Sequence, residues 1–201
     1  MIPNLLFPTP IFIEQNAYGF NKDLEDAILK LYDKSEVNWQ SKPNLHQQSD
    51  FTNFHKMIFQ KSKEVLDELQ YGYEDFQITD MWANVLKPGE EHRPHTHSNN
   101  LLSGVYYVST EKNSPGIIFA DPRPQAQVIK PKILKRLMET SDLCEYTAQK
   151  DKLIIFPSWL THFVPTNKSK TNRISISFNV MLRGTVGDSN VLQSAVYSWW
   201  P

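Results

Sequence analysis

Three of the six histidines lie within the stretch 88–108, and two of them have the spacing of a metal-binding pair. His95 and His97 are separated by one residue, so on a β-strand both imidazoles project from the same face. A third imidazole comes much later, at His162, after an apolar segment that passes through Pro157. Divalent iron is well matched to two or three protein ligands on one face, because other positions then stay open. We therefore expect His95, His97 and His162 to bind iron.

A strand with one polar face follows the last of these histidines. In the segment 173–179 strict alternation places Arg173, Ser175, Ser177 and Asn179 on one face and apolar side chains on the other. If the apolar face packs on a core, Arg173 and Ser175 point into the molecule, where a guanidinium needs an anionic partner. A fork of donors beside a hydroxyl suits a carboxylate. The alternative is a solvated polar face with Arg173 in a surface ion pair.

The elements that must position these residues are two helices followed by many short strands. Apolar residues recur at helical spacing from Asn21 to Tyr32 and again over 51–69. Beyond Phe76 the pattern predicts strands over 77–87, 102–108, 116–119, 126–129, 145–149, 153–156, 162–165 and 173–182. An edge strand is expected within 5–13, and a helical insertion over 132–140. The fold class is therefore mainly β with supporting helices (α+β), in the form of a barrel or jelly roll.

Length, charge and cysteine content limit the class of protein. The 201 residues fit a single domain, which we expect to contain helical support over about 20–72, a β core over about 76–183 and a tail over 184–201. With 21 basic and 22 acidic residues and no basic block, nucleic acid is not an expected partner. No apolar run is long enough to span a membrane, and no secretory leader is visible, so we expect a cytoplasmic protein. The single Cys144 excludes a cysteine-based metal cage.

Four motifs in order resemble the iron(II)- and 2-oxoglutarate-dependent oxygenases, and within them a branch related to the prolyl hydroxylases. They are His95-Thr-His97, Ser103-Gly-Val-Tyr-Tyr-Val108, Phe156-Pro-Ser-Trp-Leu-Thr-His162 and Arg173-Ile-Ser175. The opening Leu6-Phe-Pro-Thr-Pro10 is similar to that branch as well, so the resemblance covers nearly the whole chain. It implies a double-stranded β-helix, a cupin-like jelly roll of two facing sheets, with Fe(II) and 2-oxoglutarate as cofactors.

The resemblance also assigns roles by position. His95 matches the first metal ligand and His162 the distal one, while Arg173 matches the basic residue that holds the far carboxylate of 2-oxoglutarate. Ser175 matches the hydroxyl beside it. Asn84 and Tyr106 lie on strands from which the family adds cosubstrate contacts.

His97 departs from the family pattern, because it stands where a carboxylate ligand is expected. Gly89 with the His-x-His pair is similar to the cupin motif, in which three histidines hold iron. In a second alternative His97 is the first ligand and Asn99 falls at the variable position. In a third, Asp121 completes the site, although it more readily opens the turn that follows.

The expected function is an Fe(II)- and 2-oxoglutarate-dependent dioxygenase, a hydroxylase that releases succinate and CO2. The substrate is expected to be a small molecule or a protein side chain. One alternative is a cupin-like three-histidine metal dioxygenase without 2-oxoglutarate; another is a non-enzymatic jelly-roll binding module. The aromatic tail Tyr197-Ser-Trp-Trp-Pro201 could cap the barrel or meet a second subunit, which would give a homodimer.

Overall fold

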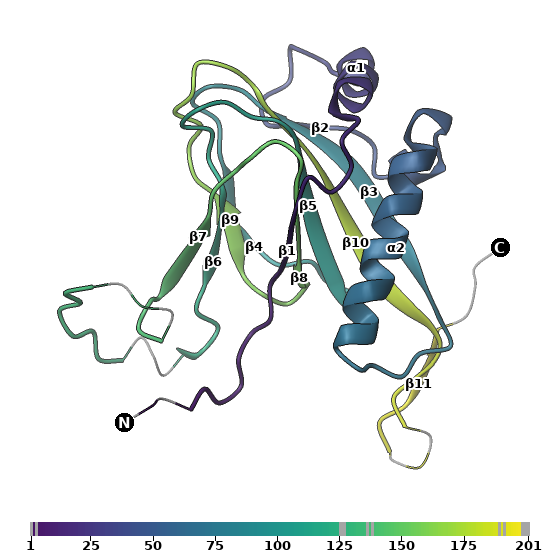
Figure 1. The fold of residues 1–201 in the computed structure, drawn as a ribbon, viewed down its shortest axis with the longest axis vertical. Helices are drawn as coiled ribbons and strands as arrows, with labels where there is room; N and C mark the ends of the chain where they lie inside the picture. The colour runs from purple at the N-terminus through teal and green to yellow at the C-terminus, as the bar shows by residue number, and fades with distance from the viewer. Residues whose placement is uncertain are drawn as a thin grey trace.

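Two antiparallel β-sheets face one another and enclose the interior of the molecule (Figure 1). The computed structural model describes residues 2, 4–124, 128–135, 137, 139–188, 190 and 192–197. Within this part of the chain the larger sheet has seven strands, in the order β1 (Phe12–Gln15), β8 (Lys152–Pro157), β5 (Leu102–Ser109), β10 (Arg173–Val186), β3 (Asp75–Leu86) and β2 (Trp39–Gln40), with β11 (Ala195–Tyr197) paired to β10. The smaller sheet has four, in the order β4 (His92–His95), β9 (His162–Val164), β6 (Ile117–Ala120) and β7 (Leu143–Tyr146).

Two helices, α1 (Asn21–Leu31) and α2 (Thr52–Glu68), cover the outer face of the larger sheet (Figure 1). Both lie where the helical spacing predicts them, and their apolar stripes are buried: Leu24, Ala27 and Ile28 on α1, and Phe54, Ile58, Val65 and Leu66 on α2. Two 3₁₀ turns, η1 (Leu45–Gln47) and η2 (Ser49–Phe51), lead into α2. The main core therefore lies between these helices and the larger sheet. Neither helix has the length and apolar character needed to cross a bilayer.

Strand β10 runs through the middle of the larger sheet, between β5 and β3. Ile174, Ile176 and Phe178 belong to the core on the helical side. A Cβ added at Gly104 of β5, which pairs with Phe178, would meet the Phe178 ring, so glycine is required for this close packing. The alternate residues of β10 face the smaller sheet, as the alternation predicts. The polar face of the strand is thereby directed into the space between the sheets.

Some elements differ from the sequence predictions. The edge strand is β1, which begins at Phe12 and pairs with β8, because the prolines before it remove ladder donors. Strands β2 and β4 are too short for a periodic pattern to indicate. The strand predicted over 126–129 and the insertion over 132–140 lie partly outside the described residues.

The larger sheet extends a few residues past residue 183, near which we expect the β core to end. Strand β10 continues to Val186, and β11 pairs with its end, so the first part of the tail is joined to the larger sheet. Trp199 and Trp200 of the aromatic tail lie outside the described residues, and a contact with a second subunit stays a prediction.

Candidate active site

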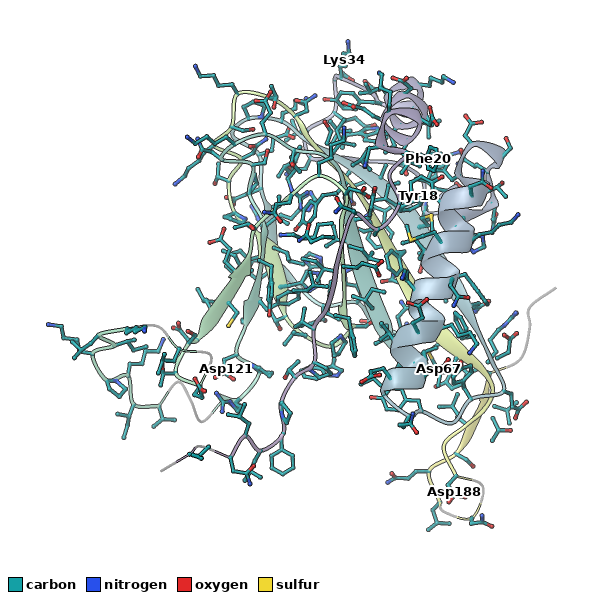
Figure 2. The ribbon with its side chains drawn as sticks, viewed as in Figure 1. Tyr18, Phe20, Lys34, Asp67, Asp121 and Asp188 are labelled. Carbon is teal, nitrogen blue, oxygen red and sulfur yellow. The ribbon has the colours of Figure 1, made fainter. Side chains whose placement is uncertain are left out.

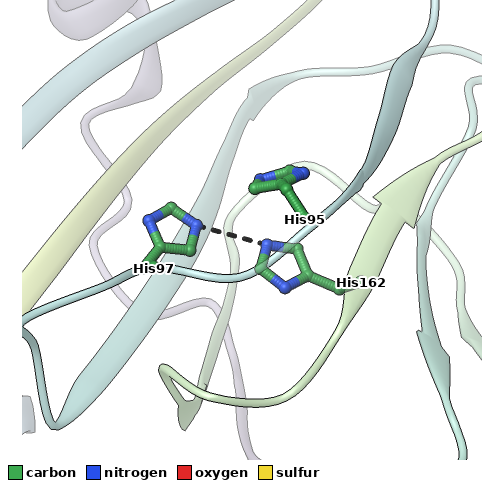
Figure 3. A group of neighbouring side chains, drawn as sticks. All are labelled: His95, His97 and His162. Carbon is green, nitrogen blue, oxygen red and sulfur yellow. Dashed lines mark hydrogen bonds between the residues drawn. The ribbon is translucent and has the colours of Figure 1, made fainter.

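Three histidines meet at the end of β4 in the smaller sheet, where the chain leaves this strand. His95 is the last residue of β4 and pairs directly with His162, the first residue of β9. Two residues further on, the amide of His97 donates a hydrogen bond of 3.0 Å to the carbonyl of Ser158, in the turn before β9. The pairing of two short strands and one backbone hydrogen bond therefore bring the three side chains together (Figure 3).

The ring nitrogens of these histidines are oriented as in a metal site. Nδ1 of His95 lies 2.7 Å from the carbonyl of Arg93, and Nδ1 of His162 lies 2.9 Å from that of Leu160. A carbonyl can only accept, so both Nδ1 atoms carry the proton and both Nε2 atoms keep a lone pair. Nε2 of His97 is 3.3 Å from Nε2 of His162, and one nitrogen of each of the three rings lies within 4.8 Å of the others (Figure 3). This donor set fits a divalent first-row metal ion.

Burial keeps two of the three imidazoles in the form that binds metals. Burial above all, together with the neighbouring His95, lowers the pKa of His97 to about 4 and that of His162 to about 3. Metal ions bind the neutral imidazole, so protons do not compete for these two rings at neutral pH.

Acid is expected to destabilise the metal-free protein through His162, which is only 4% exposed. An imidazole ordinarily takes up its proton near pH 6.5, but His162 does so near pH 3 when folded. Between these values the unfolded chain binds more protons, so this contribution is present above pH 6.5 and is lost as the pH falls, by up to about 1.4 kcal/mol per pH unit. Urea unfolding with EDTA at several pH values measures it. His162→Gln should flatten the dependence, and an unchanged slope would contradict the assignment.

A buried guanidinium lies at the other end of the same interior. Arg173 is 1% exposed; its Nε donates to the carbonyl of Pro115 at 2.8 Å, and its Nη1 donates to the hydroxyl of Ser175 at 3.0 Å. The guanidinium also lies over the ring of Tyr107, 4.8 Å from its centroid. No carboxylate pairs with Arg173 in the described part of the chain, and burial lowers its pKa. A buried cation without an anion is costly, which makes this position suited to an anionic ligand.

The hydroxyl of Tyr107 adds a polar atom beside this guanidinium. It is buried beside the Arg173 guanidinium and the backbone of Ile117, without a hydrogen bond of good geometry to either. A bound carboxylate could accept hydrogen bonds from both this hydroxyl and the guanidinium, which has no anionic partner in the described part of the chain. Tyr107 is thus a candidate that was not among the predicted cosubstrate contacts.

Tyr106, which was expected to contact the cosubstrate, is on the wrong face of β5. Its hydroxyl lies 2.8 Å from Oδ1 of Asn21 and 2.5 Å from Oδ1 of Asp151, and its ring belongs to the core beneath the helices. Successive residues of a strand point to opposite faces, so only its neighbour Tyr107 reaches the interior between the sheets. The choice between two adjacent tyrosines in an apolar strand needed the structure.

A cavity of about 640 Å³ connects the histidines with the guanidinium. It is lined by Arg173, Ser175 and Ser177 of β10, by Trp82 and Asn84 of β3, by Val105 and Phe156, and by all three histidines, and Asn38, Gln40 and Arg93 also line it. The side chain of Asn84 donates to Ser177 at 3.0 Å and accepts from Gln40 at 2.8 Å. Asn84 therefore reaches the cavity, and the loop before η1 borders it.

His92 is a further cavity residue that the sequence did not single out. It begins β4, and its pKa is lowered to about 4 by burial and then by the charge of Arg173. Its place in the same histidine-rich stretch was the available signal, but Pro94 breaks the alternation from which its direction could be inferred.

The two alternative ligands do not join the histidines. Asn99 is exposed, has a positive φ of 60° and does not line the cavity. Asp121 accepts two hydrogen bonds from the side chain of Arg123 and lies at the base of the loop after β6 (Figure 2). That ion pair and turn account for Asp121.

Two facing antiparallel sheets with a three-histidine group and a buried basic residue between them define a double-stranded β-helix with the interior of a metal-dependent oxygenase. A family model described as "Putative 2OG-Fe(II) oxygenase" matches residues 80–179, which include all three histidines and Arg173. The chain belongs to the 2OG-Fe(II) oxygenase family, whose members use Fe(II) and 2-oxoglutarate. No curated protein matches the sequence.

Several solved structures share the fold at low sequence identity. A prolyl-4-hydroxylase of Pseudomonas putida is 14% identical with a TM-score of 0.60, over 88% of this chain and 94% of that one. HygX of Streptomyces hygroscopicus, solved with nickel, 2-oxoglutarate and hygromycin B bound, is 10% identical with a TM-score of 0.59, over 87% and 83%. The α-ketoglutarate-dependent epimerase SnoN from nogalamycin biosynthesis is 9% identical with a TM-score of 0.66, over 92% and 83%. At these identities the likeness establishes the fold.

Proposed function

We propose that the chain is an Fe(II)- and 2-oxoglutarate-dependent dioxygenase that hydroxylates its substrate. The observation that carries this proposal is the unpaired guanidinium of Arg173, buried in the same cavity as three converging imidazoles. A metal group alone would suit many activities. A metal site that shares its cavity with a buried cation is suited to a dicarboxylate, because one end of the ligand can chelate the metal while the other binds the cation.

His95, His97 and His162 would hold the metal ion through their lone pairs. The two backbone carbonyls that bind Nδ1 of His95 and His162 fix both rings and increase their basicity as ligands. Three neutral ligands leave the full charge of Fe(II) uncompensated, so a dianionic cosubstrate is favoured beside them. His97 in place of a carboxylate is consistent with such a site.

Arg173 and Ser175 would hold the far carboxylate of 2-oxoglutarate, with the hydroxyl of Tyr107 and the amide of Asn84 close by. Apolar side chains of Val105, Ile117 and Phe156 line the cavity between the two ends and limit the access of water. When bound, Fe(II) and 2-oxoglutarate supply the oxidising chemistry, with succinate and CO2 as products. The side chains of the protein would position the metal and the cosubstrate and supply the positive charge that binds the far carboxylate.

Conversion of 2-oxoglutarate tests this activity. The protein reconstituted with Fe(II) is expected to release succinate and CO2 in equal amounts from 2-oxoglutarate in air, and His162→Ala should reduce the rate to that of buffer. Succinate is measured by chromatography against a sample treated with EDTA. Oxygen consumption that proceeds equally well without 2-oxoglutarate would overturn the proposal.

The three-histidine ligand set also supports a second candidate, a cupin-like dioxygenase that binds its substrate directly at the metal. This candidate gives no role to a buried, unpaired Arg173. Arg173→Ala separates the two, because it removes 2-oxoglutarate binding in the first case and leaves oxygen consumption intact in the second.

A further inference from the structure

A polar recess adjoins the histidines on the side away from Arg173. It has a volume of about 480 Å³ and shares Gln40, Trp82 and His97 with the main cavity. The rest of its lining is Ser41, Pro43, Asp80, Thr96, Ser98, Asn100 and Asn179, without a lysine or arginine. Asn179 lies six residues along β10 from Arg173, which at the rise of a strand is about 20 Å. The two ends of the interior therefore have opposite charge.

A β-bulge turns the one carboxylate of the recess toward it. Strand β3 pairs Asp80 with Asn179 and Ile78 with Val180, so Thr79 has no partner in the ladder. Such bulges bend the strand and redirect side chains, often beside active sites. Here the hydroxyl of Thr79 lies 3.0 Å from Oδ2 of Asp80, which shows that the two adjacent side chains meet. A regular strand would direct them to opposite faces.

The recess has more hydrogen-bond acceptors than donors. The single hydroxyl proton of Thr79 faces both Oδ2 of Asp80 and Oδ1 of Asn100, at 3.0 and 2.7 Å. The amide of Asn179 donates to the same Oδ2 at 3.3 Å. In the described part of the chain no hydrogen bond reaches Oδ1 of Asp80, and no cation pairs with this carboxylate. A half-buried carboxylate in this state favours a ligand with several N–H donors and a positive charge.

An aromatic face completes the surroundings. Trp82 lines both the recess and the main cavity, and its ring lies 5.6 Å from that of His97. Tryptophan attracts cations over its face, and a carboxylate and an indole together recognise ammonium and guanidinium groups. A cation held here would lie directly beside one of the three histidines.

We propose that this recess binds a positively charged N–H group of the substrate, a guanidinium or an ammonium, and that Asp80 determines specificity for it. The inference rests on the proposed function, because it places the substrate beside the proposed metal centre and opposite the cosubstrate. Arg173 selects the anion at one end of the cavity and Asp80 selects the cation at the other. The cationic group belongs either to a small molecule or to a basic side chain of a protein.

Matched probes test the recess. Argininamide and citrullinamide have nearly the same shape and differ in a guanidinium against a neutral urea, and both are titrated calorimetrically into metal-free and Zn(II)-loaded protein. Argininamide is expected to bind about tenfold more tightly than citrullinamide, because it can form a charge-assisted hydrogen bond with Asp80. Asp80→Asn should bring the ratio close to one, whereas Asp121→Asn, an equal change of charge outside the cavity, should preserve it.

A second pair of probes identifies the source of the cation. Blocked glycyl-arginyl-glycine peptide and its citrulline counterpart reproduce the discrimination if the recess accepts a protein side chain; discrimination by the free amides alone indicates a small molecule. Equal binding of argininamide and citrullinamide to the wild type, or an unchanged ratio in Asp80→Asn, would overturn the proposal. Titration with 2-oxoglutarate in the same samples tests the proposed function separately, since metal-free protein can discriminate the probes without it.

Discussion

Arg173→Met is expected to weaken the binding of 2-oxoglutarate to the metal-loaded protein by about 100-fold. The substitution removes a buried positive charge that solvent does not reach. The side chain of methionine fills much of the same space without the fork of donors. Isothermal titration with Zn(II) or anaerobic Fe(II) in the site measures the loss.

The ligand-free stability of this variant distinguishes a binding residue from a structural one. Because Arg173 has no carboxylate partner within the described residues, its replacement by an apolar side chain should leave the free energy of unfolding unchanged or raised. The stabilisation that 2-oxoglutarate confers on the wild type should disappear in the variant. Arg93→Met, at the exposed rim of the same cavity, is the matched control and should bind 2-oxoglutarate normally. Normal binding by Arg173→Met would contradict its role.

His162→Ala is expected to weaken metal binding by more than about 100-fold, since even the loss of a group that supports a ligand costs 10–100-fold. His162 is the most buried of the three histidines, and its Nε2 lies 3.3 Å from that of His97. Competition against a chelating dye with Co(II) or Fe(II) measures the affinity.

Two further variants sharpen this result. His97→Asp restores the carboxylate of the family pattern and should retain metal binding, whereas His97→Ala should lose most of it. His55→Gln, on α2 and outside the cavity, is the control and should bind metal as the wild type does. If His97→Ala bound metal with unchanged affinity, a two-histidine site would replace the three-histidine one.

The sequence predicted the parts of the site that lie on regular, amphipathic elements. In β10 polar and apolar residues alternate, and Arg173 and Ser175 face the cavity as the alternation indicates. Strand β5 is buried on both faces, so its composition does not indicate that Tyr107 and not Tyr106 reaches the interior between the sheets. When both faces of a strand are apolar, the pattern of apolar and polar residues cannot show which side chains face the interior.

Irregular backbone accounts for the other features that sequence reasoning missed. The bulge at Thr79 directs Asp80 into the polar recess, and no residue pattern indicates which strand position is left unpaired. Strand β4 is four residues long and contains Pro94, so the position of His92 follows from tertiary pairing with β9. The two-sheet fold is specified by many residues and could be predicted from the sequence. The positions of Asp80 and His92 each depend on one local irregularity of the backbone.

We propose that one cavity holds Fe(II) through three histidines and 2-oxoglutarate through Arg173. The most direct test of this proposal is anaerobic addition of 2-oxoglutarate to the Fe(II)-loaded protein, followed by visible absorption. We expect a metal-to-ligand charge-transfer band that saturates at one equivalent of cosubstrate in the wild type and fails to form with Arg173→Met at the same concentration. Absence of the band in wild-type protein that demonstrably contains iron would contradict the proposal.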